Sequence, residues 1–83
     1  MKTIIWSHEA LRQFMALPSS IQDRIEDKVA ELAVNPVTLA NQIKALKGTK
    51  ALRLRVGEYR IIFTDSGMIL SIIRVGHRSK VYR

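Results

Sequence analysis

The sequence predicts an α+β domain in which helices pack on one face of an antiparallel sheet. The chain opens with a short β-branched and aromatic segment. Two stretches with apolar residues every three to four positions follow, and the last part alternates apolar and polar residues. Helical patterns followed by a run of strands are typical of a sheet covered by helices. A length of 83 residues suits one such domain, so we expect residues 1–83 to form a single unit.

The N-terminal half is expected to supply one strand and a helical hairpin. Residues Thr3–Trp6 are mostly β-branched or aromatic, which favours a strand. Ser7 then caps a helix over about His8–Leu17, which Pro18 ends. One of the two serines after Pro18 caps a second helix, about Ile21–Val34, whose apolar residues form one stripe. The short connection between two amphipathic helices predicts a hairpin.

The C-terminal half is expected to form a three-strand antiparallel meander. Residues 37–50 are irregular or contain a short third helix, with a turn at Lys47–Lys50. Beyond this turn, alternating residues and two glycine-containing turns predict the strands Leu52–Val56, Tyr59–Asp65 and Met68–Val75. Gly76 is expected to end the last strand, which leaves a loop or a single helical turn over 77–83.

The composition argues against several classes of protein. The chain has no cysteine, and its two histidines, His8 and His77, have no acidic pair near them in sequence, so we expect no metal site and no cofactor. It contains neither a glycine-rich phosphate loop nor a Gly-x-Ser-x-Gly motif. No apolar run approaches the ~20 residues of a membrane span, and the N-terminus lacks the apolar length of a signal peptide. We therefore expect a cytoplasmic protein with no membrane partner.

Positive charge is concentrated in the second half of the chain. The net charge is +7, yet residues 1–43 carry four Lys/Arg against five acids, whereas residues 44–83 carry ten against two. Such a segregated charge favours a polyanionic partner. Nucleic acid, an acidic protein and a membrane surface all fit this charge, and so does a basic surface without a function.

Several arginines of the predicted meander are placed to converge. Arg53 and Arg55 share one face of their strand, Arg60 follows the next turn, and Arg74 and Arg78 flank Gly76-His77. Adjacent strands lie ~4.8 Å apart, which brings such groups into one patch. An arginine fork binds a phosphodiester through two parallel hydrogen bonds.

This inventory is sufficient for cutting RNA without a metal. RNA carries its own nucleophile, the 2′-hydroxyl, so cleavage needs a base, an acid and cations for the developing charge. His77 and Tyr82 could exchange the protons, while Arg53, Arg60 and Arg78 hold the charge. The inventory is not unique to a ribonuclease.

Each of these residues also has a purely structural interpretation. Arg53 and Arg55 fit the solvated face of an edge strand, and His77 fits a solvated loop residue. Tyr82, next to the C-terminus, fits a packing residue. The three lysines at the edge of the proposed patch also fit an ordinary solvated loop; they are Lys44, Lys47 and Lys50.

Four segments taken in order resemble the RelE family of toxins within the RelE/ParE superfamily. They are Leu46-Lys47-Gly48, Leu52–Phe63 (LRLRVGEYRIIF), Val75-Gly76-His77-Arg78 and Val81-Tyr82-Arg83. Each segment is weak alone, and their order is specific. The resemblance covers nearly the whole chain, including the N-terminal strand and a Leu-Pro pair between the helices.

The resemblance implies a toxin that cuts mRNA on the ribosome through attack of the 2′-hydroxyl, without a metal. It also implies a RelB-like antitoxin, encoded beside the toxin, that silences it. Operator DNA would be contacted only through the toxin–antitoxin complex.

The resemblance also implies roles for particular residues. Arg60 and Arg78 match arginines that bind or stabilise the phosphate, Arg53 matches a basic site residue, and Tyr82 matches a tyrosine of proton transfer or base stacking. His77 stands where some members carry a basic residue. We therefore expect four catalytic residues, Arg60, Arg78, Tyr82 and His77. We also expect six RNA-binding residues, which are Arg53, Arg55, Lys50, Lys47, Arg74 and Lys80.

Two alternatives and one departure accompany this hypothesis. The chain could be a ParE-like toxin that binds DNA gyrase and has no ribonuclease site, or a degenerate member that binds only its antitoxin and DNA. The departure lies at Ala51, where the best-known RelE toxins carry a further lysine. Lys50 is adjacent, but an offset of one residue on a strand reverses its face.

Overall fold

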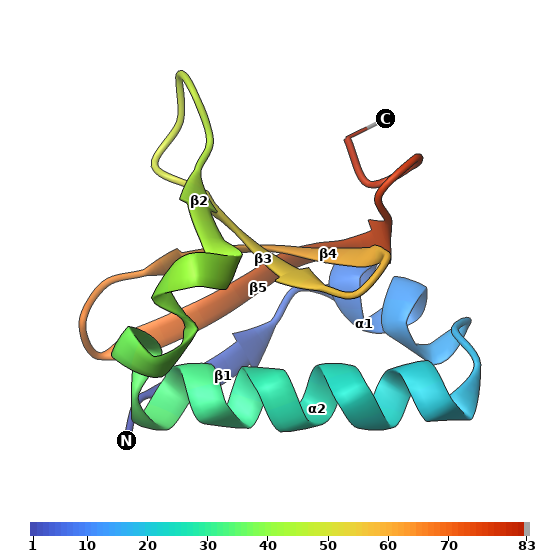
Figure 1. Cartoon of the computed structure of the whole chain (residues 1–83), viewed down its shortest axis with the longest axis horizontal. Coiled ribbons are helices and arrows are strands. Elements are labelled where there is room, and N and C mark those ends of the chain that lie inside the picture. The colour runs from blue at the N-terminus through green and yellow to red at the C-terminus, as the bar shows by residue number, and fades with distance from the viewer. Residues whose placement is uncertain (83) are drawn as a thin grey trace.

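The computed structural model describes residues 1–82 and confirms an α+β domain with an N-terminal strand, two helices and one sheet (Figure 1). Its elements in chain order are β1 (Thr3–Trp6), α1 (His8–Met15), α2 (Ser19–Val34), the 3-10 helix η1 (Pro36–Gln42), β2 (Ile43–Ala45), β3 (Leu52–Val56), β4 (Tyr59–Asp65) and β5 (Ile69–His77).

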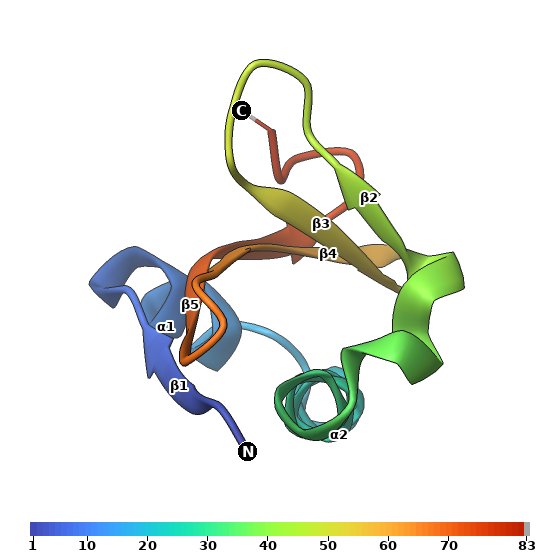
Figure 2. The same ribbon diagram turned by 90° about the vertical axis from the view of Figure 1, so that its left-hand side faces the viewer.

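The five strands form one mixed sheet in the order β1-β5-β4-β3-β2. The first strand, β1, pairs in parallel with β5, and all other neighbours are antiparallel. Helix α2 lies along one side of the sheet, and Figure 2 shows it end-on beneath the strands. Among residues 1–82, no helix covers the opposite side of β3 and β4 (Figure 1).

The three predicted strands of the meander are present, and a fourth strand, β2, extends it. Residues 37–50 were expected to be irregular or helical, but η1 is followed by β2, which pairs with β3. The connecting turn closes through Leu46 N–H, which donates to the Ala51 carbonyl at 3.1 Å. Gly48 supplies the positive φ of 80° that this turn needs. A strand of three residues is too short to show a clear alternation.

Strand β5 also continues past its predicted end. Gly76 was expected to break the strand, yet it pairs with Arg60, and His77 pairs with Tyr59. Backbone pairing to β4 compensates for the weak strand preference of glycine. A register shift leaves Ile73 as an extra residue, because Arg74 lies opposite Ile62 and Ile72 lies opposite Phe63.

The helix starts follow from local hydrogen bonds. Ser7 caps α1 as predicted, since its Oγ accepts the Ala10 N–H at 3.0 Å. At α2 the predicted serine cap is wrong. Pro18 occupies the cap position, and its carbonyl accepts the N–H groups of Ile21 and Gln22 at 3.0 Å each. Helix α1 ends at Met15, two residues before the predicted end.

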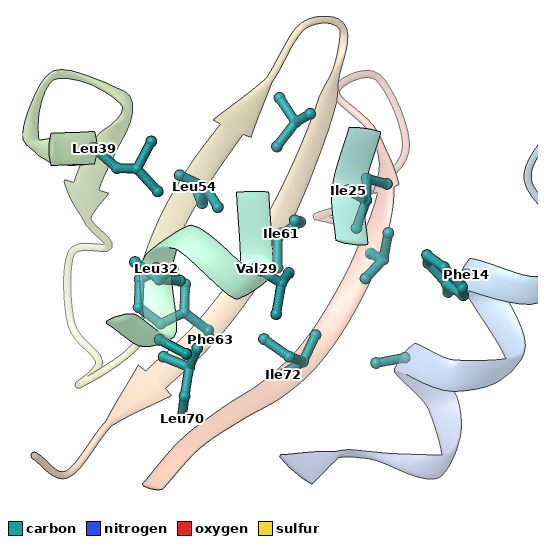
Figure 3. Packing of buried hydrophobic residues seen from close by; sticks show 14 residues of the cluster. Phe14, Ile25, Val29, Leu32, Leu39, Leu54, Ile61, Phe63, Leu70 and Ile72 are labelled. Atoms are coloured by element: carbon teal, nitrogen blue, oxygen red, sulfur yellow. The ribbon is translucent and has the colours of Figure 1, made fainter. Parts of the chain in front are cut away.

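The core lies between the helices and one face of the sheet (Figure 3). Helix α2 contributes Ile25, Val29 and Leu32, which pack against residues such as Leu54 and Phe63. Since Leu54 and Val56 point into this core, Arg53 and Arg55 point to the other face. Within residues 1–82, neither helix has the length and apolarity to cross a bilayer.

Candidate functional site

Three strands direct four cations to the face of the sheet opposite α2. Residues paired directly across antiparallel strands point to the same side. Lys44 on β2 lies opposite Arg53 on β3, and Arg55 lies opposite Arg60 on β4. Because Leu54 between the two β3 arginines is buried in the core, all four cations occupy the outer side. We call Lys44, Arg53, Arg55 and Arg60 the basic face.

Two further segments rise on the side of the basic face. The β2–β3 loop and residues 78–82 both project away from α2, as Figures 1 and 2 show. The loop carries Lys47 and Lys50, and the C-terminal segment carries Arg78, Lys80 and Tyr82; all five side chains are exposed. The structure thus gathers most of the predicted RNA-binding residues around one surface.

The Arg60 side chain is held by backbone carbonyls of the β3–β4 turn. Its Nη1 donates to the carbonyl oxygen of Gly57 at 2.8 Å and to that of Tyr59 at 2.9 Å. Neutral acceptors position a guanidinium without cancelling its charge. Arg60 is therefore a preorganised cation at the centre of the surface.

Electrostatic coupling groups four predicted site residues around Arg60. Burial is the main cause that lowers the pKa of Arg60, and the charge of Arg53 lowers it further. Tyr82 acts in the opposite direction and raises the pKa, whereas Arg55 and Arg78 lower it. These three arginines and Tyr82 consequently lie within electrostatic range of Arg60, and an anion among them would relieve the repulsion between the arginines.

One donor of the basic face has no acceptor. The Nε–H of Arg53 is buried and forms no hydrogen bond with any group of residues 1–82. A buried charged donor without an acceptor is destabilising, and such groups concentrate at functional sites. A phosphate oxygen is an acceptor of the required kind.

Arg78 is held at the end of β5 by Glu58. Its Nε lies 2.8 Å from Glu58 Oε2, and its backbone N–H donates to the Glu58 carbonyl at 2.8 Å. Both side chains are more than 60% exposed, at 61% and 64%, so water screens the ion pair and its strength is small. A phosphate can compete for this arginine.

The structure separates His77 from the basic face. His77 pairs with Tyr59, whose ring packs against the core, so both side chains point to the helix side of the sheet. The two rings meet edge to face at 5.6 Å and 81°. Nδ1 accepts the Ser79 N–H at 3.1 Å, so in the neutral ring the proton is on Nε2.

Arg74 connects three parts of the molecule. It shares the outer side of the sheet with Arg53, with Ile62 between them. Its Nη2 lies 3.4 Å from Glu9 of α1, and its Nη1 donates to the Val81 carbonyl at 3.2 Å. These contacts hold the C-terminal segment, which carries Tyr82, against the end of the sheet.

From the sequence, Lys44 was placed only at the edge of the patch, and Glu58 was missed. Lys44 belongs to the basic face because β2 pairs with β3, and its only sequence signal was the short alternation Ile43-Lys44-Ala45. Glu58 holds Arg78, a contact that no spacing indicates. Ala51 lies two residues before Arg53 and therefore near the same face. Among residues 1–82, no three His, Asp or Glu side chains are grouped to hold a metal ion.

Known proteins with similar sequences are toxins. The family model described as "ParE toxin of type II toxin-antitoxin system, parDE" matches residues 4–82. The chain is 26% identical over 81 residues to the mRNA interferase toxin RelE of Escherichia coli K12, covering 93% of this chain and 85% of that protein.

Solved structures with the same fold include RelE chains in toxin–antitoxin complexes. A RelB–RelE complex from Methanococcus jannaschii aligns with a TM-score of 0.76 and 28% identity over 94% of both chains. The archaeal RelE–RelB complex of Pyrococcus horikoshii OT3 aligns with a TM-score of 0.77 at 20% identity, over 96% of this chain and 98% of that one, and so shows the shared fold alone. The chain therefore belongs to the toxins of type II toxin–antitoxin systems, as a RelE-type member of the RelE/ParE superfamily.

Proposed function

We propose that this toxin is a metal-independent endoribonuclease that cuts mRNA on the ribosome by attack of an RNA 2′-hydroxyl on the adjacent phosphate. The observation that carries the proposal is the group of arginines around Arg60 on the helix-free side of the sheet. Such a group has the right charge for a phosphodiester whose charge increases in the transition state. The similarity to an mRNA interferase supports the same reaction.

The arginines stabilise the phosphorane formed when the 2′-oxygen attacks. Arg60 and Arg78 bind its non-bridging oxygens, and the unpaired Nε–H of Arg53 donates a further hydrogen bond. Attack forms the bond from the 2′-oxygen to phosphorus and breaks the bond to the 5′-oxygen, which leaves a 2′,3′-cyclic phosphate and a 5′-hydroxyl.

The two protons of this reaction are assigned to Tyr82 and His77. Tyr82 is 55% exposed beside Arg60, so its hydroxyl can reach RNA and its ring can stack on a base. We assign the larger share of proton transfer to Tyr82, because His77 faces the helix side and can meet RNA only at the end of β5.

The partner that silences the toxin is proposed to be a RelB-like antitoxin. The solved relatives named above are complexes of RelE with RelB. An acidic, amphipathic segment of the antitoxin would cover the basic face and keep RNA away from Arg60. The complex, and not the toxin alone, would contact operator DNA. We place this pair in the cytoplasm, where mRNA and ribosomes are found.

A second candidate is favoured by the family match, whose description names ParE. A ParE-like toxin would bind DNA gyrase and leave RNA intact. A degenerate member would bind only its antitoxin and DNA. The complete Arg53, Arg60 and Arg78 set on one surface supports the ribonuclease over both.

Primer extension on mRNA from cells that express this chain separates the three functions. Cuts inside translated codons, absent from cells that express Arg60→Ala at equal level, support the ribonuclease. Intact mRNA with arrested replication supports the gyrase inhibitor. Intact mRNA with normal growth supports the degenerate member.

A further inference from the structure

A cationic hollow lies beside the β3–β4 turn and shares Arg55 with the basic face. It has a volume of about 360 Å³ and forms where α2 and the end of η1 approach the turn. Its lining residues are Arg24, Lys28, Gln42, Arg55 and the turn residues Val56, Gly57 and Glu58. We call it the turn pocket.

The turn pocket has an excess of positive charge. Three of its side chains are cations, and its one carboxylate, Glu58, is paired with Arg78 at 2.8 Å. Lys28 makes only a long contact of 3.7 Å to Glu31. Within residues 1–82, neither Arg24 nor Arg55 forms an ion pair with a carboxylate. A bound anion would balance this positive charge.

The Arg24 guanidinium lies against the β3–β4 turn in the pocket. Gly57 has a φ of +58°, and a Cβ built there would lie 2.7 Å from Arg24 Nη2 and 3.3 Å from Nη1. The guanidinium therefore lies against the bare backbone of the turn, a position that any side chain at residue 57 would obstruct.

A buried polar atom in the pocket also lacks a partner. Gln42 Oε1 is buried and accepts no hydrogen bond from the part of the chain that the structure describes. The amide of Gln42 therefore needs a donor that the chain does not supply. A ribose 2′-hydroxyl is such a donor, and it lies next to a phosphate only in RNA.

We propose that the turn pocket binds a backbone phosphate and a ribose hydroxyl of RNA at a nucleotide outside the cleaved linkage. This inference rests on the proposed function and extends it to a second subsite. Arg55 links the two subsites, because it lines the pocket and lies opposite Arg60 in register. RNA bound at Arg60 would then continue across the β3–β4 turn toward α2.

The test compares RNA binding by Arg24→Ala and by Arg12→Ala, in a Tyr82→Phe background that slows cleavage. Both substitutions remove one exposed helical arginine, but Arg12 lies on α1 beside a different, apolar hollow. Fluorescence anisotropy measures the affinity for a single-stranded RNA decanucleotide and for a dinucleotide, each over a range of salt concentrations.

We expect Arg24→Ala to weaken decanucleotide binding about tenfold and to reduce the salt slope by about one phosphate contact. The affinity of Arg24→Ala for the dinucleotide stays unchanged, because a dinucleotide occupies only the subsite around Arg60, where the cleaved linkage binds. Arg12→Ala leaves both ligands unaffected. Equal behaviour of the Arg24 and Arg12 variants with the decanucleotide overturns the proposal, and so does an equal loss for the dinucleotide.

Two further measurements test the contact with the ribose hydroxyl and the chemical class of the partner. Gln42→Leu is expected to reduce the preference for RNA over the same DNA sequence, a ratio that a general folding defect does not change. If Arg24→Ala weakens only the binding of a polyglutamate peptide, the pocket serves an acidic polypeptide and the RNA assignment is wrong.

Failure of this inference can be distinguished from failure of the proposed function. If the wild-type protein cuts mRNA and Arg24→Ala binds RNA normally, the proposed function stands and the second subsite is refuted. If RNA binding depends on Arg24 but the wild-type protein leaves mRNA intact, the second subsite stands and the proposed function is refuted.

Discussion

At the scale of single residues, the site depends on where each cation is held. Arg60 is fixed by two backbone carbonyls, whereas Arg78 is held by one exposed carboxylate. Arg53 has a buried donor without an acceptor. The three arginines thus form one surface, although each has different local contacts. Substitutions at these positions should therefore separate effects on RNA binding from effects on folding.

Replacing Arg78 with alanine is expected to lower the rate of mRNA cleavage on the order of 10²–10³-fold, the usual cost of one preorganised donor. Stability should change little because the Arg78–Glu58 pair is exposed. Single-turnover cleavage on programmed ribosomes measures the rate, and thermal unfolding measures stability. Wild-type cleavage by a folded Arg78→Ala protein would refute the assignment. Arg12→Ala controls for the loss of charge.

Tyr82→Phe separates proton transfer from stacking, because it removes the hydroxyl and keeps the ring. We expect a slower single-turnover rate and a changed pH–rate profile for Tyr82→Phe, and a smaller effect for His77→Ala, whose side chain faces the helix side. If Tyr82→Phe matches wild type and only Tyr82→Ala is slow, Tyr82 stacks on a base or packs, and transfers no proton.

Ala51→Lys is expected to increase activity. Position 51 lies two residues before Arg53, so a lysine there would add a cation near the basic face, as in the best-known RelE toxins. The cleavage rate on programmed ribosomes should rise, whereas Lys50→Ala combined with Ala51→Lys tests whether side-chain position matters at constant charge. A rate for Ala51→Lys equal to or below wild type would contradict this expectation.

At the scale of elements, the alternation of residues predicted most of the sheet and much of the site. Arg53 and Arg55 alternate with core residues, so their shared face could be inferred before the structure was known. The short strand β2 could not, because three residues show too little pattern, and Lys44 was therefore placed in a loop at the edge of the patch. The side of the sheet that His77 faces depends on the register shift at Ile73, which no local pattern specifies.

Lys2 and Asp65 join the start of β1 to the β4–β5 turn. The Lys2 ammonium donates to Asp65 Oδ2, and the Gly67 N–H donates to Oδ1 at 2.8 Å. The Lys2 hydrogen bond is the main cause that lowers the pKa of Asp65. A carboxylate with a lowered pKa stabilises the fold above its unfolded pKa of ~3.9, and this stabilisation is lost as the pH falls through the lower, folded pKa.

Asp65→Asn should therefore reduce the free energy of unfolding by about 1 kcal/mol at pH 7. The difference from wild type should shrink as the pH falls below ~4, where wild-type Asp65 also becomes protonated. Urea denaturation at pH 7 and pH 3 measures both values. Asp23→Asn, an exposed helical position, controls for the charge change. A difference that does not depend on pH would show that the ion pair is not its source.

At the scale of the whole molecule, the sheet divides the domain into two parts with different roles. One face is buried under α2 and forms the core (Figure 3). The other carries the basic face between the β2–β3 loop and the C-terminal segment (Figure 1). Because the positive charge is concentrated in residues 44–83, the same residues that build the antiparallel meander also make the surface for a polyanion.

The most direct test of this account is single-turnover cleavage of mRNA on programmed ribosomes by the wild-type toxin and by Arg60→Gln. We predict that wild type leaves a 2′,3′-cyclic phosphate and a 5′-hydroxyl at each cut, and that Arg60→Gln is slower on the order of 10²–10³-fold while it still folds. Uncut mRNA with wild type, or equal rates for the two proteins, would contradict the assignment of ribonuclease activity to the basic face.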